Sequence, residues 1–299
     1  MRATRSISVE KPNPFSLRIG AYRELVKFRL SFLVAFSSAF GYALAQPQQI
    51  NWVGLFWLSF AGFLLSGASI TINQVLEQKY DAKMKRTQNR PLPTGKISSK
   101  EAIAFAIFLG LASIIILWIV TNPLTVSIAF ISMVLYSFVY TPLKRVGPIA
   151  VFVGAIPGAL PPLLGWTAVT GVLSVEALLI FGIQFVWQFP HFWAIAWVAD
   201  EDYQKAGFKL LPGAGQKDMR TALQIMTYTM LLLPLGLLPA KFGITGINSA
   251  IVVTVCGVLF LSQTFRLMLD NSRKSALRIM FGSFLYLPIV QIAFLLDKM

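Results

Sequence analysis

The residues Asn73, Glu77 and Asp81 place one carboxamide and two carboxylates at intervals of four residues. On an α-helix each step of four residues advances about 40°, so the three oxygen-bearing side chains would share a stripe of roughly 80°. Oxygen ligands of this kind suit Mg²⁺, which takes one or two carboxylates and completes its shell with water and substrate phosphates. An ordinary polar helix end at a membrane surface is the alternative interpretation of this acidic stripe.

Two arginines follow the acidic stripe, Arg86 and Arg90. A guanidinium group binds phosphate oxygens in a bidentate fork. A metal-binding stripe beside such cations suits a diphosphate, because the metal neutralises some of its oxygens and the cations hold the others. Lys144 and Arg145 form a further basic pair. They either clamp the same diphosphate or serve only to set the membrane topology.

A second polar stretch begins at Asp200-Glu201-Asp202-Tyr203 and continues through Lys205. Neighbouring residues on a helix lie about 100° apart, so at most one or two of these three carboxylates can face one partner. A solvated helix end is the competing interpretation, and it fits Asp202 beside Tyr203 least well.

His191 is the single histidine, and it follows Pro190 within an apolar, aromatic segment. An ionisable side chain within a membrane span indicates a functional site, because burying it without a partner is costly. Its possible roles are iron ligand, proton donor or acceptor, and a group that orients one of these. A hydrogen-bonded packing residue is the alternative.

Membrane helices must position these groups, because 56% of the 299 residues are hydrophobic and only 13% are charged, against roughly 25% charged in soluble domains. Apolar segments of about 20 residues, long enough to cross a bilayer, recur along the chain. The sequence therefore predicts an all-α, polytopic membrane protein. Its nine spans are predicted at 22–45, 52–73, 102–121, 124–141, 148–168, 173–198, 221–240, 246–265 and 276–296.

The net charge of +14 is distributed unevenly. Lys and Arg gather in alternate connections between the spans, 24 on one side against Lys241 and Lys298 on the other. Membrane topology explains this pattern better than binding to nucleic acid does. By the positive-inside rule the N-terminus is cytoplasmic, and nine spans leave the C-terminus outside.

A cytoplasmic tail at residues 1–21 and a single membrane domain at 22–299 account for the chain. We expect no cleavable signal peptide, because no short apolar core with a cleavage site precedes the first span. Cys256 is the only cysteine, which excludes a disulfide framework and a thiolate metal site. The two most elaborate loops, 74–101 and 199–220, share the cytoplasmic side, where we expect the site.

The pattern Asn73-xxx-Glu77-xxx-Asp81, followed by Arg86-Thr87 and Asn89-Arg90-Pro91-Leu92, resembles the first signature of the UbiA superfamily of membrane prenyltransferases. Further motifs resemble its protoheme IX farnesyltransferase branch, which makes heme O. They are Leu143-Lys144-Arg145, Gly158-Ala159 with Pro161-Pro162 and Gly165-Trp166, Trp187-Gln188 with Pro190-His191, and Asp202-Tyr203 with Ala206-Gly207 and Leu211-Pro212.

The resemblance implies a bundle of nine helices with a central cavity open to the membrane. It also implies Mg²⁺-dependent transfer of a farnesyl group from farnesyl diphosphate to a vinyl group of heme b, giving heme O and diphosphate. The lack of a long amphipathic presequence favours a bacterial inner membrane over a mitochondrial one. Heme A synthase or terminal oxidase assembly factors would be downstream partners. With it we assign metal binding and catalysis to Asn73, Glu77 and Asp81, further catalytic roles to His191 and Asp202, and diphosphate binding to Arg86, Arg90, Lys144, Arg145 and Lys205.

Two features depart from the family pattern. Position 77 is Glu where the family more often has Asp, which keeps the charge on a longer arm. The second acidic motif is not intact, because Ala199 and Tyr203 occupy the expected acidic positions. This departure argues against a second Mg²⁺ held entirely by the protein.

Two alternative functions remain open from the sequence. One is a UbiA-type prenyltransferase for an aromatic quinone precursor, against which His191 and the Asp202-Tyr203 motif argue. The other is a transporter of a lipid-like or anionic molecule, in which polar residues line a pathway. Clustering of the special residues on one side argues against alternating access.

Overall fold

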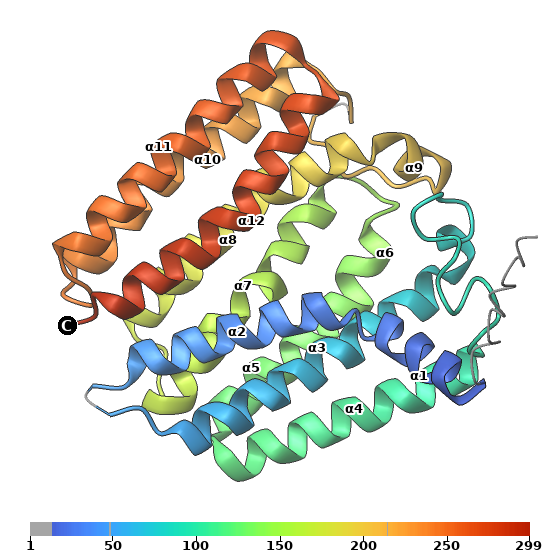
Figure 1. The fold of residues 1–299 in the computed structure, drawn as a ribbon, viewed down its shortest axis with the longest axis horizontal. Coiled ribbons are helices and arrows are strands. Elements are labelled where there is room, and N and C mark those ends of the chain that lie inside the picture. Colours follow the sequence, from blue (N-terminus) through green and yellow to red (C-terminus); the bar gives the residue numbers. More distant parts are fainter. Residues whose placement is uncertain (1–13, 48, 214) are drawn as a thin grey trace, which may run out of the picture.

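The computed structural model describes residues 14–47, 49–213 and 215–299, and within them every regular element is a helix (Figure 1). Nine helical segments in this part of the chain are long and apolar enough to cross a membrane, which confirms the predicted all-α architecture and span count. They are α2 (Phe28–Ala45), α3 (Trp52–Asp81), α4 (Ser99–Val120), the composite Pro123–Leu143, α7 (Ile149–Thr170), α8 (Val175–Val198), α10 (Met219–Lys241), α11 (Ile247–Asp270) and α12 (Arg273–Leu296).

The composite span changes its helical type along its length. It consists of α5 (Pro123–Val134), the π-helix η1 (Leu135–Tyr140) and the short α6 (Thr141–Leu143). A π-helix is rare and often lies at a functional site, because the wider turn re-aims the side chains that follow it. Here the following residues are Thr141 and Lys144.

Two short helices flank the bundle, α1 (Pro14–Leu25) and α9 (Asp200–Lys205). Residues 1–13 of the predicted tail lie outside the described residues, whereas 14–21 belong to α1. The predicted first span at 22–45 is broken, because Lys27 has left-handed backbone angles (φ 43°, ψ 63°) between α1 and α2. A non-glycine residue in this conformation is uncommon and marks a position held by its surroundings.

Helices α7 and α8 lie between a group made of α2, α3 and α4 and a group made of α10, α11 and α12, and the two groups also touch directly through α2 and α12 (Figure 1). Helix α2 approaches α7 until their backbones touch. A Cβ atom at Gly41 would collide with the carbonyl of Pro162, and one at Gly165 with the carbonyl of Ser38. This close approach fixes the first group against the centre of the bundle.

Helices α2 and α12 meet at one end of the bundle and diverge toward the other (Figure 1). We call the diverging end, which carries loops 82–98, 144–148 and 199–218, the basic end, and its opposite the far end. A buried network closes the space between α2, α8 and α12 where they meet. Gln291 Nε2 donates to Ser37 Oγ and Gln184 Oε1 at 2.9 and 3.0 Å, and Ser37 Oγ donates to Gln184 Oε1 at 2.9 Å.

The far end is tied together by the residues that follow α12. Lys298 Nζ donates to the carbonyls of Ala43 and Gln46 at 3.0 and 2.6 Å. Asp297 accepts the backbone N–H of Ser249 at 2.7 Å and thereby caps the start of α11. The last span is thus joined to the first and to its neighbour.

Candidate active site

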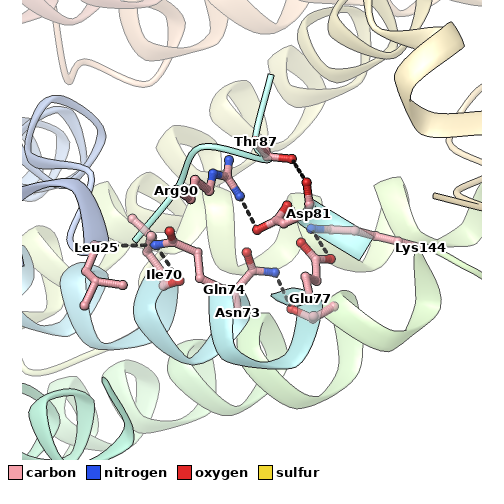
Figure 2. Close-up of polar contacts among 10 residues, drawn as sticks. Leu25, Ile70, Asn73, Gln74, Glu77, Asp81, Thr87, Arg90 and Lys144 are labelled. Atoms are coloured by element: carbon pink, nitrogen blue, oxygen red, sulfur yellow. Dashed lines mark hydrogen bonds and ion pairs between the residues drawn. The ribbon is translucent and has the colours of Figure 1, made fainter. Parts of the chain in front are cut away.

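The acidic stripe lies on α3, because this helix continues beyond the predicted span end at residue 73 as far as Asp81 (Figure 2). Asn73, Glu77 and Asp81 are only 2%, 5% and 1% exposed. Each side chain is bonded to a residue of another element or loop, Thr141, Lys144 or Arg90 (Figure 2). Burial and pairing exclude an ordinary solvated helix end.

The π-helix and α6 face Asn73. Its Nδ2 donates to Thr141 Oγ1 at 2.9 Å, and the Thr141 hydroxyl donates to the carbonyl of Tyr136 at 2.9 Å. Because the Asn73 amide nitrogen is committed to Thr141, its carbonyl oxygen is left as the available ligand atom.

Lys144, at the end of α6, forms a buried ion pair with Glu77 (Figure 2). The Nζ to Oε1 distance is 2.8 Å, and the side chains are 11% and 7% exposed. Burial opposes the charge of Lys144, but the Glu77 carboxylate, together with Tyr136 and Tyr203, outweighs it, so the pKa of Lys144 is raised above its usual value. The ammonium also lies 4.6 Å from the centre of the Tyr140 ring. Lys144 therefore stays charged inside the site.

Asp81 is paired with Arg90 at 2.6 Å between Oδ2 and Nη1 (Figure 2). The other carboxylate oxygen, Oδ1, is buried without a hydrogen-bond partner. Thr87 holds the loop that carries Arg90, because its hydroxyl donates to the Asp81 carbonyl at 2.8 Å. A buried carboxylate oxygen without a partner is costly and marks the place where a ligand would bind.

Asp202 lies beside the first loop, where it binds backbone and not the acidic stripe. Its carboxylate oxygens accept the N–H groups of Lys85 and Arg86 at 3.2 and 3.3 Å. The Arg86 guanidinium lies 4.8 Å from the centre of the Tyr203 ring. The second polar stretch thus positions the arginine-bearing loop.

The remaining predicted cations lie around this arrangement. Lys205 is half exposed and lies 3.8 Å from Asp202. Arg145 donates to the Tyr80 hydroxyl at 2.6 Å and stacks on that ring. Asp200 pairs with Lys217 at 3.2 Å, so it serves the loop and not the site.

Lys27 was not predicted from the sequence as a site residue. It shares its surroundings with Arg90, Lys144 and Asp81, and it is in none of the ion pairs among the described residues. Burial, reinforced by the charges of Arg90 and Lys144, lowers the pKa of Lys27 from 10.5 to about 7. In the sequence, Lys27 is one of several basic residues before the first span, which are explained by membrane topology, so nothing distinguished it as a site residue.

His191 lies apart from the acidic stripe, on the side of α8 that faces α12. Its Nδ1 is 2.8 Å from Ser283 Oγ. The imidazole stacks on Trp187 with ring centres 4.4 Å apart and meets the Phe284 ring edge to face at 4.9 Å. The described contacts bring Asn73, Glu77, Asp81, Arg90 and Lys144 together, and they leave His191 outside this group.

A comparison with protein families matches residues 34–287 to the UbiA prenyltransferase family. The chain belongs to this family. The chain is 53% identical to a protoheme IX farnesyltransferase of Cytophaga hutchinsonii over 93% of its length and 97% of that protein's. It is 41% identical to a second protein of that name from Christiangramia forsetii, with 96% of each chain covered.

Solved structures of this family share the fold. The structure of a digeranylgeranylglyceryl phosphate synthase has a TM-score of 0.77 at 20% identity, covering 94% of this chain and 98% of that one. A UbiA homolog from Archaeoglobus fulgidus bound to GPP and Mg²⁺ has a TM-score of 0.62 at 16% identity, covering 92% and 99%. At these identities the likeness confirms the predicted UbiA-type bundle and carries nothing further.

The donor atoms of the acidic stripe fit a hard divalent cation. Two carboxylates and one amide oxygen lie on one buried face, and Asp81 Oδ1 lacks a partner. Within the described residues no group of three or more His, Cys, Asp or Glu side chains gathers to hold a metal. Such a site suits a cation that takes its other ligands from substrate oxygens and water, as Mg²⁺ does.

Proposed function

We propose that this protein transfers a farnesyl group from farnesyl diphosphate to a vinyl group of heme b, giving heme O and diphosphate. The observation that carries the proposal is the buried set of two carboxylates paired with two cations, Glu77 with Lys144 and Asp81 with Arg90. The carboxylates of this set can bind a metal cation, and its basic side chains can bind the oxygens of a diphosphate. The name shared by the relatives at 53% and 41% identity supplies the acceptor.

In this proposal Asn73, Glu77 and Asp81 would hold one Mg²⁺, which would neutralise diphosphate oxygens and make diphosphate a better leaving group. Lys144 and Arg90 then exchange partners, moving from the carboxylates to phosphate oxygens. With both ligands bound, the two carboxylates would face the metal ion and the two cations would face phosphate oxygens. The metal alone would leave Lys144 and Arg90 unpaired, and diphosphate alone would leave Glu77 and Asp81 unpaired. Metal and diphosphate should therefore bind cooperatively.

Arg86, Arg145, Lys205 and Lys27 extend the positive surface that meets the diphosphate. Preorganised cations stabilise the charge that develops on the leaving group as its C–O bond breaks. As the C–O bond to diphosphate breaks, the allylic carbon joins one vinyl carbon and the oxygen of a water molecule joins the other. The proton that this water loses leaves with diphosphate, so atoms and charge balance. Asp202 contributes by holding the loop of Arg86 in place.

We further propose that the basic end faces the cytoplasm of a bacterium and that the chain lies in its inner membrane. The charge asymmetry supports this orientation by the positive-inside rule. Heme O would pass to heme A synthase or to the assembly of terminal oxidases. His191 is proposed to contact the porphyrin.

The test is prenyl transfer by purified protein in lipid nanodiscs. Labelled farnesyl diphosphate and Mg²⁺ are supplied with either heme b or 4-hydroxybenzoate, and labelled product is resolved by chromatography. We expect a farnesylated heme and no farnesylated benzoate. Product formed with 4-hydroxybenzoate but not with heme b would favour a quinone-type prenyltransferase. If no product forms with either acceptor, the protein is neither of these two enzymes.

A further inference from the structure

Ser283 on α12 has a single hydroxyl proton and two close neighbours. The hydroxyl donates to the Met280 carbonyl at 2.6 Å, and the same oxygen lies 2.8 Å from His191 Nδ1. A serine hydroxyl donates one hydrogen bond and accepts up to two. Because the carbonyl can only accept, the short contact to Met280 takes the proton, and Nδ1 must donate to Ser283.

This arrangement determines the form of the imidazole. With its proton on Nδ1, the neutral ring of His191 carries a free lone pair on Nε2. Ser283 is fully buried and its main chain is held as well, because Trp187 Nε1 donates to the Ser283 carbonyl at 3.0 Å. The stacked Trp187 ring then fixes the plane of the imidazole. The free nitrogen is thus held in one direction.

His191 contacts a partly exposed aromatic side chain of α12. The histidine is 7% exposed, and Phe284, whose ring meets its face, is 42% exposed. The imidazole thus contacts a side chain that reaches the accessible surface, on α12, which diverges from α2 toward the basic end (Figure 1). Histidines that ligate metals commonly donate their other ring N–H to a fixed acceptor, which sets the tautomer and strengthens the ligand.

We propose that Nε2 of His191 ligates the iron of the heme substrate and that Ser283 is the positioning residue that keeps this nitrogen unprotonated. The proposal rests on heme being the acceptor in the proposed function. This tautomer suits a metal ligand and excludes a neutral histidine that donates a proton from Nε2. A proton acceptor would need the same free nitrogen, so the heme spectra in the second test separate that role from iron ligation.

The first test reads the tautomer without heme or activity. His191 is the only histidine in the sequence, so ¹⁵N-histidine labelling of protein without a histidine tag gives one pair of ring nitrogens. Protonated and unprotonated ring nitrogens resonate in separate ranges. We expect Nδ1 protonated and Nε2 unprotonated in the wild type, and a shift toward protonated Nε2 in Ser283→Ala. A protonated Nε2 in the wild type would overturn the proposal.

The second test measures ferric heme binding by absorbance and electron paramagnetic resonance. We expect Ser283→Ala to weaken binding about 10- to 100-fold and His191→Gly to lose the nitrogen-ligated spectrum, with added imidazole restoring it. Ser262→Ala is the matched control, because Ser262 also donates to a carbonyl three residues earlier, at 2.8 Å, but is exposed. A spectrum unchanged in His191→Gly would overturn the proposal.

The two proposals fail separately. Wild-type protein that farnesylates heme with a protonated Nε2 would contradict only the ligand assignment. Protein that binds heme through His191 but forms no farnesylated product would contradict only the proposed reaction.

Discussion

The two acidic regions at the basic end look alike in sequence but are built differently. Glu77 and Asp81 are buried, and each pairs with a cation that is itself largely buried, Lys144 and Arg90 respectively. Asp202 instead accepts backbone N–H groups of the 82–98 loop, and Asp200 pairs with Lys217, whose side chain is 37% exposed. The difference teaches that carboxylates become a candidate metal site through burial against cations that a substrate can take over, and not through local density of acidic residues.

The largest expected effect separates Asp81 from Asp200. Asp81→Asn removes a charge at the centre of the proposed metal site, and we expect the kcat/KM for farnesyl transfer to fall about 10²- to 10³-fold. Asp200→Asn should change it less than about threefold, because Asp200 pairs only with its own loop. A loss of similar size in both variants at saturating Mg²⁺ would remove the distinction between the regions.

A smaller but more specific effect is expected at Lys144. Lys144→Met should lower kcat/KM about 10²-fold, and it should also strengthen metal binding in the absence of diphosphate, because Glu77 loses its competing cation. Mn²⁺ binding followed by electron paramagnetic resonance measures the second effect.

Loss of one partner of a buried pair can also destabilise the fold. The double variant Glu77→Gln with Lys144→Met, which leaves no unpaired charge there, is the folding control. Metal binding that stays the same or weakens in a folded Lys144→Met variant would contradict the proposed exchange of partners.

A positional effect is expected at Asp202. Asp202→Asn leaves one acceptor oxygen for the two amides of Lys85 and Arg86, because the new NH₂ group cannot accept from an N–H. We expect the loss of one charge-assisted bond to cost about 1.5 kcal/mol or about tenfold. We expect the KM for farnesyl diphosphate to rise while kcat changes little, with faster hydrogen exchange at 84–90. Glu201→Gln is the exposed control. A fall in kcat with unchanged exchange would instead give Asp202 a chemical role.

The smallest effect is a pH dependence from Lys27. With a pKa of about 7, its amine is charged below pH 7 and mostly neutral at pH 8 in the free protein. A bound diphosphate favours the charged form, so binding at pH 8 should take up as much as one proton, and affinity should fall by at most about tenfold per pH unit above 7.

Calorimetry in buffers of different ionisation enthalpy measures this proton uptake. Lys27→Met should abolish it, whereas Lys96→Met, at an exposed position of the neighbouring loop, should preserve it. Equal uptake in wild type and Lys27→Met would exclude Lys27 from the diphosphate site.

The architecture could be predicted because it depends on local properties. Apolar length and alternating charge gave all nine spans, and a four-residue spacing placed the acidic stripe on one helix face. The break at Lys27 could not be predicted, because its left-handed backbone accompanies the packing of α1 and α2 against α3 and does not come from a glycine or proline.

The pairing within the site was equally hidden from the sequence. Lys144 reaches Glu77 across 67 positions through a π-helix, which depends on tertiary packing against α3 and α7. The partner of His191 lies 92 residues away on α12. Such contacts require the three-dimensional arrangement, so the sequence identified most of the candidate residues but not Lys27, Thr141 or Ser283.

Lys298 alters how the charge asymmetry of this chain should be weighed. Its ammonium is bound by two carbonyls at the end of α2, so in the folded protein it neutralises a helix terminus and is not a free surface charge. Among the described residues of the far end, Lys241 is then the single basic side chain without such a role. The finished protein therefore presents to the lipid headgroups a more one-sided charge than the nascent chain presents to the insertion machinery.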